Sequence, residues 1–114
     1  VKTKGNYKMS KYIEVTTVNI DEVIKSGVVL LDFWATWCGP CRMLSPVIDQ
    51  LAIDFDGKAK ICKVNSDDQQ DLTVKYGVRS IPTLIFLKDG EIVDQMIGSS
   101  ANKQTLTDKL NSLL

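Results

Sequence analysis

The apolar positions of the chain fall into short continuous runs, separated by segments in which apolar residues recur every three or four positions. The run VVLLDFWA at 28–35 is apolar at almost every position, which is typical of a strand covered on both faces. Further strands are expected at 12–16 and 59–65, where β-branched and aromatic residues gather. A hairpin is expected at 83–98, because Asp89-Gly90 between two apolar runs suits a two-residue turn.

Four helices are expected from the segments with helical periodicity. The first begins near Asn19 and stops at Gly27, and the third covers 69–76 with Asp67 or Asp68 as its cap. The long second helix and the closing helix each have an apolar stripe that would face a sheet. The stripe of the long helix is Met43, Leu44, Val47, Ile48, Leu51, Ala52 and Phe55, and that of the closing helix is Leu106, Leu110 and Leu113.

The order of these elements predicts a single α/β domain. Alternating strands and helices indicate parallel strands joined by right-handed crossovers, to which the final hairpin adds an antiparallel strand at one edge. We therefore expect a central mixed five-stranded sheet, βαβαβαββα, flanked by four helices over residues 9–114. Because Met9-Ser10 reads as a start, Val1 to Lys8 is interpreted as an extension, either native or left by cloning.

Composition limits the classes of function. The 114 residues include 14 Lys and Arg and 14 Asp and Glu, so no broad basic face for nucleic acid is implied. The longest apolar run is far too short to span a bilayer. The basic N-terminus has no apolar core and is not an intact signal peptide, so we expect a cytoplasmic protein without nucleic-acid or membrane partners.

The motif with the clearest chemistry is FWATWCGPCRM, which places Cys38 and Cys41 three positions apart. With three cysteines and no histidine in the chain, chemistry must rely on cysteine, carboxylate and lysine. Cys38 is expected where a buried strand ends and the long helix begins, and Pro40 fits that first turn. A helix N-terminus favours a thiolate, so Cys38 is predicted to be an exposed nucleophile with a lowered pKa. Cys41, one helical turn later, would be its less exposed partner.

Two other readings of this pair are weaker. A structural zinc site needs four ligands, whereas the only further cysteine is Cys62, in the middle of a predicted core strand. A purely structural disulfide would close a very small loop and stabilise the fold little.

WATWCGPC with the upstream Asp32, and SIPT at 80–83 before a strand, resemble the thioredoxin family. The resemblance extends from about Met9 to Leu114 and includes Lys63 and Gly98 in the expected order. It implies the thioredoxin fold and a general protein disulfide reductase, in which the first cysteine of the motif attacks and the second resolves. It also implies a monomer that binds no cofactor and no metal. Its electrons would come from NADPH through a flavoprotein, thioredoxin reductase, and its substrates would be disulfide-containing proteins.

Asp32 and Lys63 each have two interpretations. A carboxylate in a buried strand is costly, so Asp32 is either a hydrogen-bonded or edge-strand structural acid or a buried base with a raised pKa that takes the proton of Cys41 through water. Lys63 shares a strand face with Ile61 and would ordinarily be an exposed strand lysine. The resemblance favours the base, and it implies that Lys63 pairs with Asp32 as part of the catalytic group.

Pro82 would ordinarily be a trans proline at the start of a strand. The resemblance implies instead a cis Ile81–Pro82 bond facing Cys38, which leaves the Ile81 backbone free to pair with an extended substrate. The resemblance further implies an apolar surface for substrate binding, here called the docking surface. Its residues are Trp37, Gly39, Pro40, Ile81, Pro82, Ile97 and Gly98.

Three residues lie outside this pattern. Trp34 is interpreted as core, and Cys62 as a small buried hydrophobe. Ser66 stands where the family usually has an aliphatic residue, which makes the rim of the docking surface more polar and bears on partner preference.

Two other functions use the same fold. Oxidases and isomerases usually carry histidine within the CxxC, and Gly39-Pro40 argues against them. A non-catalytic interaction module would not need its cysteines.

Overall fold

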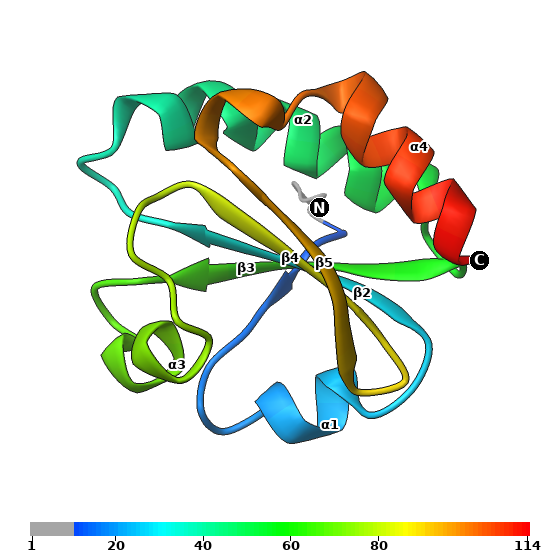
Figure 1. The fold of residues 1–114 in the computed structure, drawn as a ribbon, viewed down its shortest axis with the longest axis horizontal. Coiled ribbons are helices and arrows are strands. Elements are labelled where there is room, and N and C mark those ends of the chain that lie inside the picture. Colours follow the sequence, from blue (N-terminus) through cyan, green and yellow to red (C-terminus); the bar gives the residue numbers. More distant parts are fainter. Residues whose placement is uncertain (1–10) are drawn as a thin grey trace, which may run out of the picture.

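The computed structural model describes residues 11–114, apart from the side chain of Ser99. The predicted extension Val1–Lys8 and the predicted domain start at Met9 therefore lie outside the described residues. Two helices cover each face of a central sheet: α2 and α4 on one face, α1 and α3 on the other (Figure 1). Within residues 11–114, no helix is both long and apolar enough to cross a membrane. The helices are α1 (Ile20–Ile24), α2 (Gly39–Asp54), α3 (Gln70–Lys75) and α4 (Lys103–Leu113), with a short 3-10 turn η2 (Gly98–Ser100) before α4.

The sheet has the strand order β1-β3-β2-β4-β5, which confirms the predicted mixed five-stranded sheet. The first three strands are parallel, as expected, but β4 runs antiparallel to β2, whereas strand–helix alternation predicted a parallel strand there. The reason lies in α3, which is found near the end of the sheet at which β3 stops (Figure 1). A connection that stays at that end must send the next strand back the opposite way. The strands are β1 (Ile13–Glu14), β2 (Val28–Trp34), β3 (Ala59–Asn65), β4 (Thr83–Lys88) and β5 (Glu91–Ile97).

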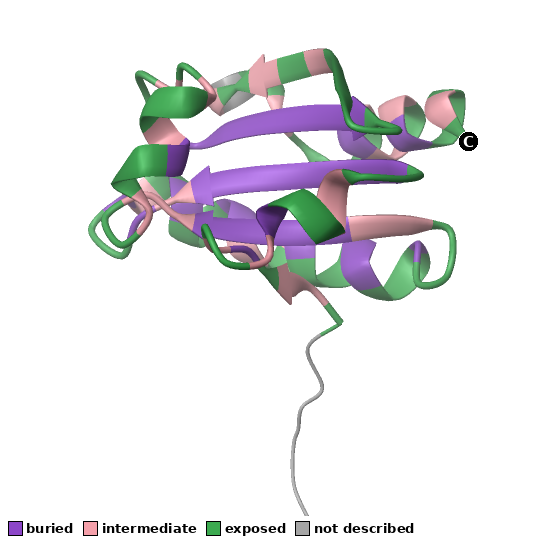
Figure 2. Ribbon diagram, turned by 90° about the horizontal axis from the view of Figure 1, so that it is seen from below, coloured by how far each residue is buried: buried purple, intermediate pink, exposed green. Residues whose placement is uncertain are grey.

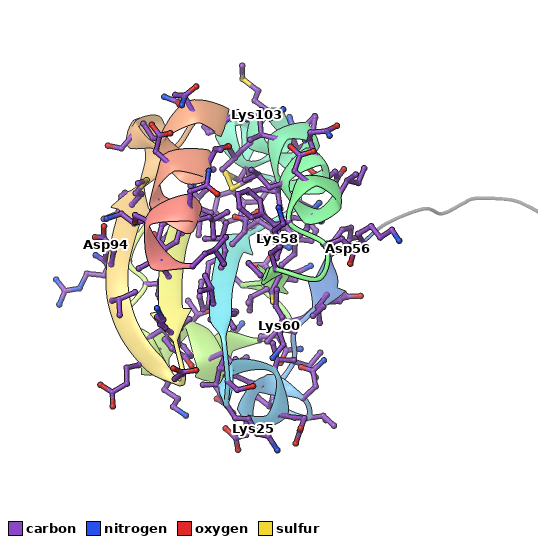
Figure 3. All side chains as sticks on the ribbon, turned by 90° about the vertical axis from the view of Figure 1, so that its right-hand side faces the viewer. Lys25, Asp56, Lys58, Lys60, Asp94 and Lys103 are labelled. Carbon is purple, nitrogen blue, oxygen red and sulfur yellow. A yellow bond between two sulfur atoms is a disulfide. The ribbon has the colours of Figure 1, made fainter. Side chains whose placement is uncertain are left out.

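The core consists of two apolar layers, one on each face of the sheet. Successive side chains of a strand point to opposite faces, so Leu30 packs under α2 and α4, and Leu31 packs against α1 and α3. This is why β2 is apolar at nearly every position. Buried residues concentrate in the central strands (Figure 2), whereas charged side chains such as Lys25, Asp94 and Lys103 project from the outside (Figure 3).

Local details match the sequence unevenly. The hairpin turn is as predicted, with positive φ at Asp89 (51°) and Gly90 (87°), the backbone that a tight two-residue turn requires. The predicted cap of α3 is wrong, because the N-cap residue is Gln69 and its side chain makes no capping hydrogen bond. The Asp67 carboxylate is engaged elsewhere, by the indole of Trp37.

Candidate functional site

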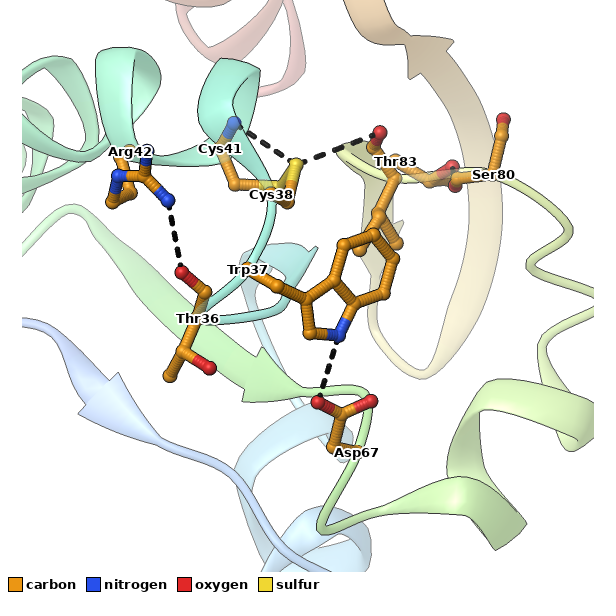
Figure 4. Close-up of a disulfide and its surroundings, with 9 residues drawn as sticks. Thr36, Trp37, Cys38, Cys41, Arg42, Asp67, Ser80 and Thr83 are labelled. Carbon is orange, nitrogen blue, oxygen red and sulfur yellow. Dashed lines mark hydrogen bonds between the residues drawn. A yellow bond between two sulfur atoms is a disulfide. The ribbon is translucent and has the colours of Figure 1, made fainter.

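The two cysteines of the motif lie where β2 ends and α2 begins. β2 ends at Trp34, and the backbone N–H of Cys38 donates to the carbonyl of Ala35 (3.2 Å) in the turn that follows. Cys38 is the N-cap residue of α2 and forms a disulfide with Cys41, their Cα atoms 5.2 Å apart (Figure 4). The predicted position of the pair at a strand end and a helix start is confirmed.

The electrostatic environment of the two sulfur atoms differs. The backbone N–H of Cys41 donates to the Sγ of Cys38 at 3.1 Å (Figure 4). α2 is 16 residues long, and Pro40 occupies its first turn. The free N–H groups and the dipole of that turn favour negative charge on the cap residue. A thiolate is therefore better stabilised at Cys38 than at Cys41.

The predicted exposure of Cys38 is wrong for the oxidised protein. Cys38 is 5% exposed and Cys41 3%, so both are buried. The pair forms a small cluster with Ala35, against which Trp34 and Ile81 pack. The difference in exposure between the two cysteines is therefore small.

The segment that faces the disulfide contains a cis Ile81–Pro82 peptide bond, as the resemblance implied. The carbonyl oxygen of Ile81 lies 3.8 Å from the Sγ of Cys38. Among the described residues, this carbonyl accepts no hydrogen bond from a backbone N–H, whereas that of Pro82 accepts one from Gly98 (2.9 Å). An extended chain placed against Ile81 would find an open backbone acceptor beside the disulfide.

The residues of the docking surface are partly brought together. Pro40, Ile81, Pro82 and Gly98 line one groove of about 520 Å³, which extends along α2 and η2. Trp37 is 68% exposed, and its indole N–H donates to a carboxylate oxygen of Asp67 at 3.0 Å (Figure 4).

The other members of the docking surface differ in how they contribute. Ile97 is half exposed at the end of β5, where it is paired in register with Thr83. Gly39 is half-buried beside the disulfide. Pro82 is mostly buried and lines the groove with only a small part of its surface.

Asp32 is buried, with 2% of the residue exposed. It lines a cavity of about 260 Å³ together with Cys41, Ser45 and Lys63, and its Oδ1 atom has no hydrogen-bond partner among the described residues. Burial raises the pKa of Asp32 to about 7, against a smaller lowering by the charge of Lys63. A cavity of this size, with carboxyl, hydroxyl and ammonium groups in its lining, has room for water between the carboxyl group and Cys41.

Lys63 does not form the ion pair with Asp32 that the resemblance implied. The two residues are register partners on β2 and β3, but the ammonium of Lys63 lies 2.9 Å from Asp49 Oδ1 and donates to Ser45 Oγ at 2.8 Å. It also lies 4.2 Å from the ring centre of Tyr12. These partners, two on α2 and one before β1, draw the lysine away from the strand that carries Asp32. The reading of Lys63 as an exposed strand lysine is also wrong, since the residue is buried.

Three residues outside the docking surface have clear outcomes. Cys62 is fully buried, as expected, and burial raises the pKa of its thiol to about 12. It packs in the core layer next to α1 and α3, not beside the disulfide. Trp34 is only half-buried, so its interpretation as core is wrong; it packs on the disulfide cluster. The N–H of Ser66 donates to the Trp34 carbonyl (2.8 Å), and its buried hydroxyl has no partner among the described residues.

Several site residues were not found from the sequence. Met43 was assigned to the apolar stripe of α2, yet it is 82% exposed and lines the groove. Asp67 was assigned as a helix cap but binds Trp37. Ser45 and Asp49, four residues apart on one face of α2, carry no distinguishing signal, because polar residues at such spacing are usual on the solvent side of a helix.

Comparison with known proteins agrees with this geometry. The sequence model of the thioredoxin family matches residues 11–112. The chain is 51% identical over 102 residues to a thioredoxin of Staphylococcus haemolyticus, covering 90% of this chain and 97% of that protein. It is 55% identical over 86 residues to a thioredoxin of Staphylococcus saprophyticus, covering 75% and 83%.

A solved structure has the same fold. A mutant thioredoxin from Halobacterium salinarum superposes with a TM-score of 0.83 at 38% identity, covering 94% of this chain and 96% of that one. Together with the buried acid and the cysteine pair at the start of α2, these matches show that the chain belongs to the thioredoxin family of thiol–disulfide oxidoreductases.

Proposed function

We propose that this protein is a general reductase of protein disulfides in which Cys38 attacks and Cys41 resolves. The observation that carries this assignment is the hydrogen bond from the Cys41 N–H to the Sγ of Cys38 (3.1 Å). That donor stabilises a thiolate on Cys38, the form that attacks the substrate disulfide. Cys41 has no equivalent amide among the described residues, so it serves better as a thiol that must be deprotonated when needed.

The reaction consists of two exchanges. The Cys38 thiolate attacks one sulfur of a substrate disulfide, forming a mixed disulfide and releasing the other substrate sulfur as a thiolate. The Cys41 thiolate then attacks Cys38 Sγ, forming the intramolecular disulfide and releasing the second substrate thiolate. The substrate gains two electrons, and the cysteine pair loses two.

Asp32 is proposed as the acceptor of the Cys41 proton, with Lys63 adjusting its charge. A carboxyl group with a pKa of about 7 is suited to accept a proton near neutral pH. The cavity that it shares with Cys41 supports transfer through water. Lys63 lines the same cavity, and its charge lowers the pKa of Asp32, which supports its role.

The docking surface is proposed to bind an extended segment of the substrate. The open carbonyl of Ile81 supports pairing with a substrate backbone, and the groove supports apolar side chains along α2. The expectation that Ser66 makes the rim more polar is not met, because its hydroxyl is buried and is not available to a partner.

The reduced form is proposed to be restored by electrons from NADPH through a flavoprotein thioredoxin reductase. We further propose that the protein is cytoplasmic, because a reducing compartment keeps such a cysteine pair available for turnover. We also propose that it acts as a monomer.

The roles of the cysteines are tested by reduction of insulin disulfides with dithiothreitol as electron source. Cys38→Ser is expected to abolish turnover, and Cys41→Ser to accumulate a mixed disulfide with the substrate, detected by mass on a non-reducing gel. Cys62→Ser is the matched control and should retain activity, because that thiol is buried in the core away from the site. A mixed disulfide that accumulates in Cys38→Ser and not in Cys41→Ser would reverse the two roles.

A further inference from the structure

The Lys63 ammonium binds two residues of α2, although the neighbouring residue on β2, Asp32, has no ion pair. Asp32 and Lys63 are adjacent in the register of β2 and β3, and both line the same cavity. A buried lysine next to a buried carboxylate ordinarily pairs with it. Here the ammonium instead contacts Asp49 Oδ1 (2.9 Å) and Ser45 Oγ (2.8 Å), and the Oδ1 atom of Asp32 is left without a hydrogen bond among the described residues.

We infer that Asp49 and Ser45 are positioning residues for the exchange reaction, which hold the Lys63 ammonium on α2 and thereby keep Asp32 free of a direct ion pair. This inference rests on the proposed role of Asp32 as proton acceptor. A carboxylate in a direct ion pair would be a weaker base, because an opposite charge within hydrogen-bond distance stabilises its ionised form. An Asp32 without that pair keeps its affinity for the proton of Cys41.

The geometry explains why Lys63 prefers α2. Asp49 offers a carboxylate whose side chain is 50% exposed and therefore still hydrated, whereas Asp32 would have to be ionised in a buried place. Ser45 adds a second acceptor one helical turn before Asp49. The Tyr12 ring, 4.2 Å from the ammonium, covers the lysine from the side of β1. The contacts with Asp49, Ser45 and Tyr12 therefore outweigh the ion pair that Lys63 could form with Asp32.

The other charged groups near Asp32 are few. The charged residues that line the cavity beside Asp32 are Glu14 of β1, Arg42 of α2 and Lys63 of β3. Asp49 of α2 lies on the far side of the Lys63 ammonium and forms an ion pair with it. Arg42 donates to the carbonyl of Thr36 (3.0 Å), which fixes it at the mouth of the helix. On β4, the register partner of Asp32 is the apolar Leu84. Lys63 is therefore the cation whose position can change most when α2 is altered.

The inference is tested on the oxidised protein, in which the disulfide cysteines do not titrate, by following the Asp32 carboxyl carbon by NMR as a function of pH. Asp49→Asn is expected to lower the pKa of Asp32 by about 1 or more, because Lys63 is released toward it. Ser45→Ala should lower it by a smaller amount, and because this change removes no charge, its effect must come through Lys63. Asp54→Asn is the matched control: it removes a carboxylate of α2 that pairs with Lys103 (3.7 Å), and it should leave Asp32 unchanged.

A second comparison separates positioning from the direct effect of the Asp49 charge. In a Lys63→Met background, the shift produced by Asp49→Asn should fall to less than half its value. A shift of equal size with and without Lys63, or no shift in Asp49→Asn, would overturn the inference. The pH profile for release of substrate from the mixed disulfide should move to lower pH with the Asp32 titration. If Asp32→Asn releases substrate at the wild-type rate, the proposed base is wrong, whereas the NMR titrations still decide where Lys63 is held.

Discussion

Replacement of Asp32 by asparagine should stabilise the folded protein, and the gain should depend on pH. The unfolded chain loses this proton near pH 3.8, whereas burial keeps it on the folded protein until about pH 7. Between these values the unfolded state binds fewer protons, so the stability of the wild-type protein falls as pH rises. The difference of about 3 between the two pKa values converts, at about 1.36 kcal/mol per pKa unit, to about 4 kcal/mol. This loss is absent below about pH 4 and complete above about pH 7.

The assay is guanidinium unfolding of the oxidised wild-type and Asp32→Asn proteins at intervals from pH 4 to pH 8. The difference in the free energy of unfolding should increase in favour of the variant by several kcal/mol up to about pH 7 and then remain constant. Asp94→Asn is a control of opposite sign, because hydrogen bonds from Lys109 and from the Gln95 N–H lower the pKa of Asp94. That variant should be less stable by an amount that stays nearly constant from pH 4 to pH 8, because the lowered pKa of Asp94 lies below this range. A difference for Asp32→Asn that does not change between pH 4 and pH 8 would refute the desolvated carboxyl group.

Two further predictions concern the packing of α4 and are measured by urea unfolding at neutral pH. Leu106→Ala should lower the free energy of unfolding by about 2–5 kcal/mol, because this side chain is fully buried between α4 and the sheet; a loss below about 1 kcal/mol would contradict that packing. Asn102→Ala should cost about 1 kcal/mol, because it removes the capping box in which Asn102 accepts from the Thr105 N–H (2.9 Å). Asn102→Asp keeps the acceptor and should retain most of the stability, and equal losses in both variants would exclude capping as the cause.

Asp32 is expected to lower the free energy of unfolding at neutral pH while serving the reaction. A carboxyl group that lowers stability at neutral pH is retained where its proton affinity is useful, which is the trade-off often found in active sites. The rest of the domain tolerates it because two complete apolar layers enclose the sheet. Asp32, which lowers stability, lies on β2, the strand that leads into the cysteine pair. The reactive groups are therefore held by a central strand of the sheet.

The sequence predicted the elements well, because each had a strong local cause. The bounds of β3 were as expected, and the continuous apolar run predicted β2 to within one residue, since a strand covered on both faces has no polar side. The turn at Asp89-Gly90 followed from the backbone that it requires. The position of Cys38 at the start of α2 followed from the change of period at that point.

Other features depend on which side of an element meets a neighbour. Apolar periodicity placed Met43 in a stripe, but the groove beside η2 leaves it exposed. Asp67 has the residue type of a helix cap, yet the indole of Trp37 is within reach of its carboxylate. Local propensity could not predict the contact of Asp67 with Trp37, because the two residues are 30 positions apart in the chain.

By itself, the sequence determined the order of strands and helices, the cysteine pair at the beginning of a helix and the presence of an acid in a buried strand. These follow from residue type and spacing, which act over a few neighbouring residues. Only the tertiary structure decided that both cysteines are covered, that β4 runs antiparallel to β2, and that Lys63 contacts Asp49 rather than Asp32. Each of these depends on distances between segments remote in sequence, where small differences in desolvation and charge select one partner over another.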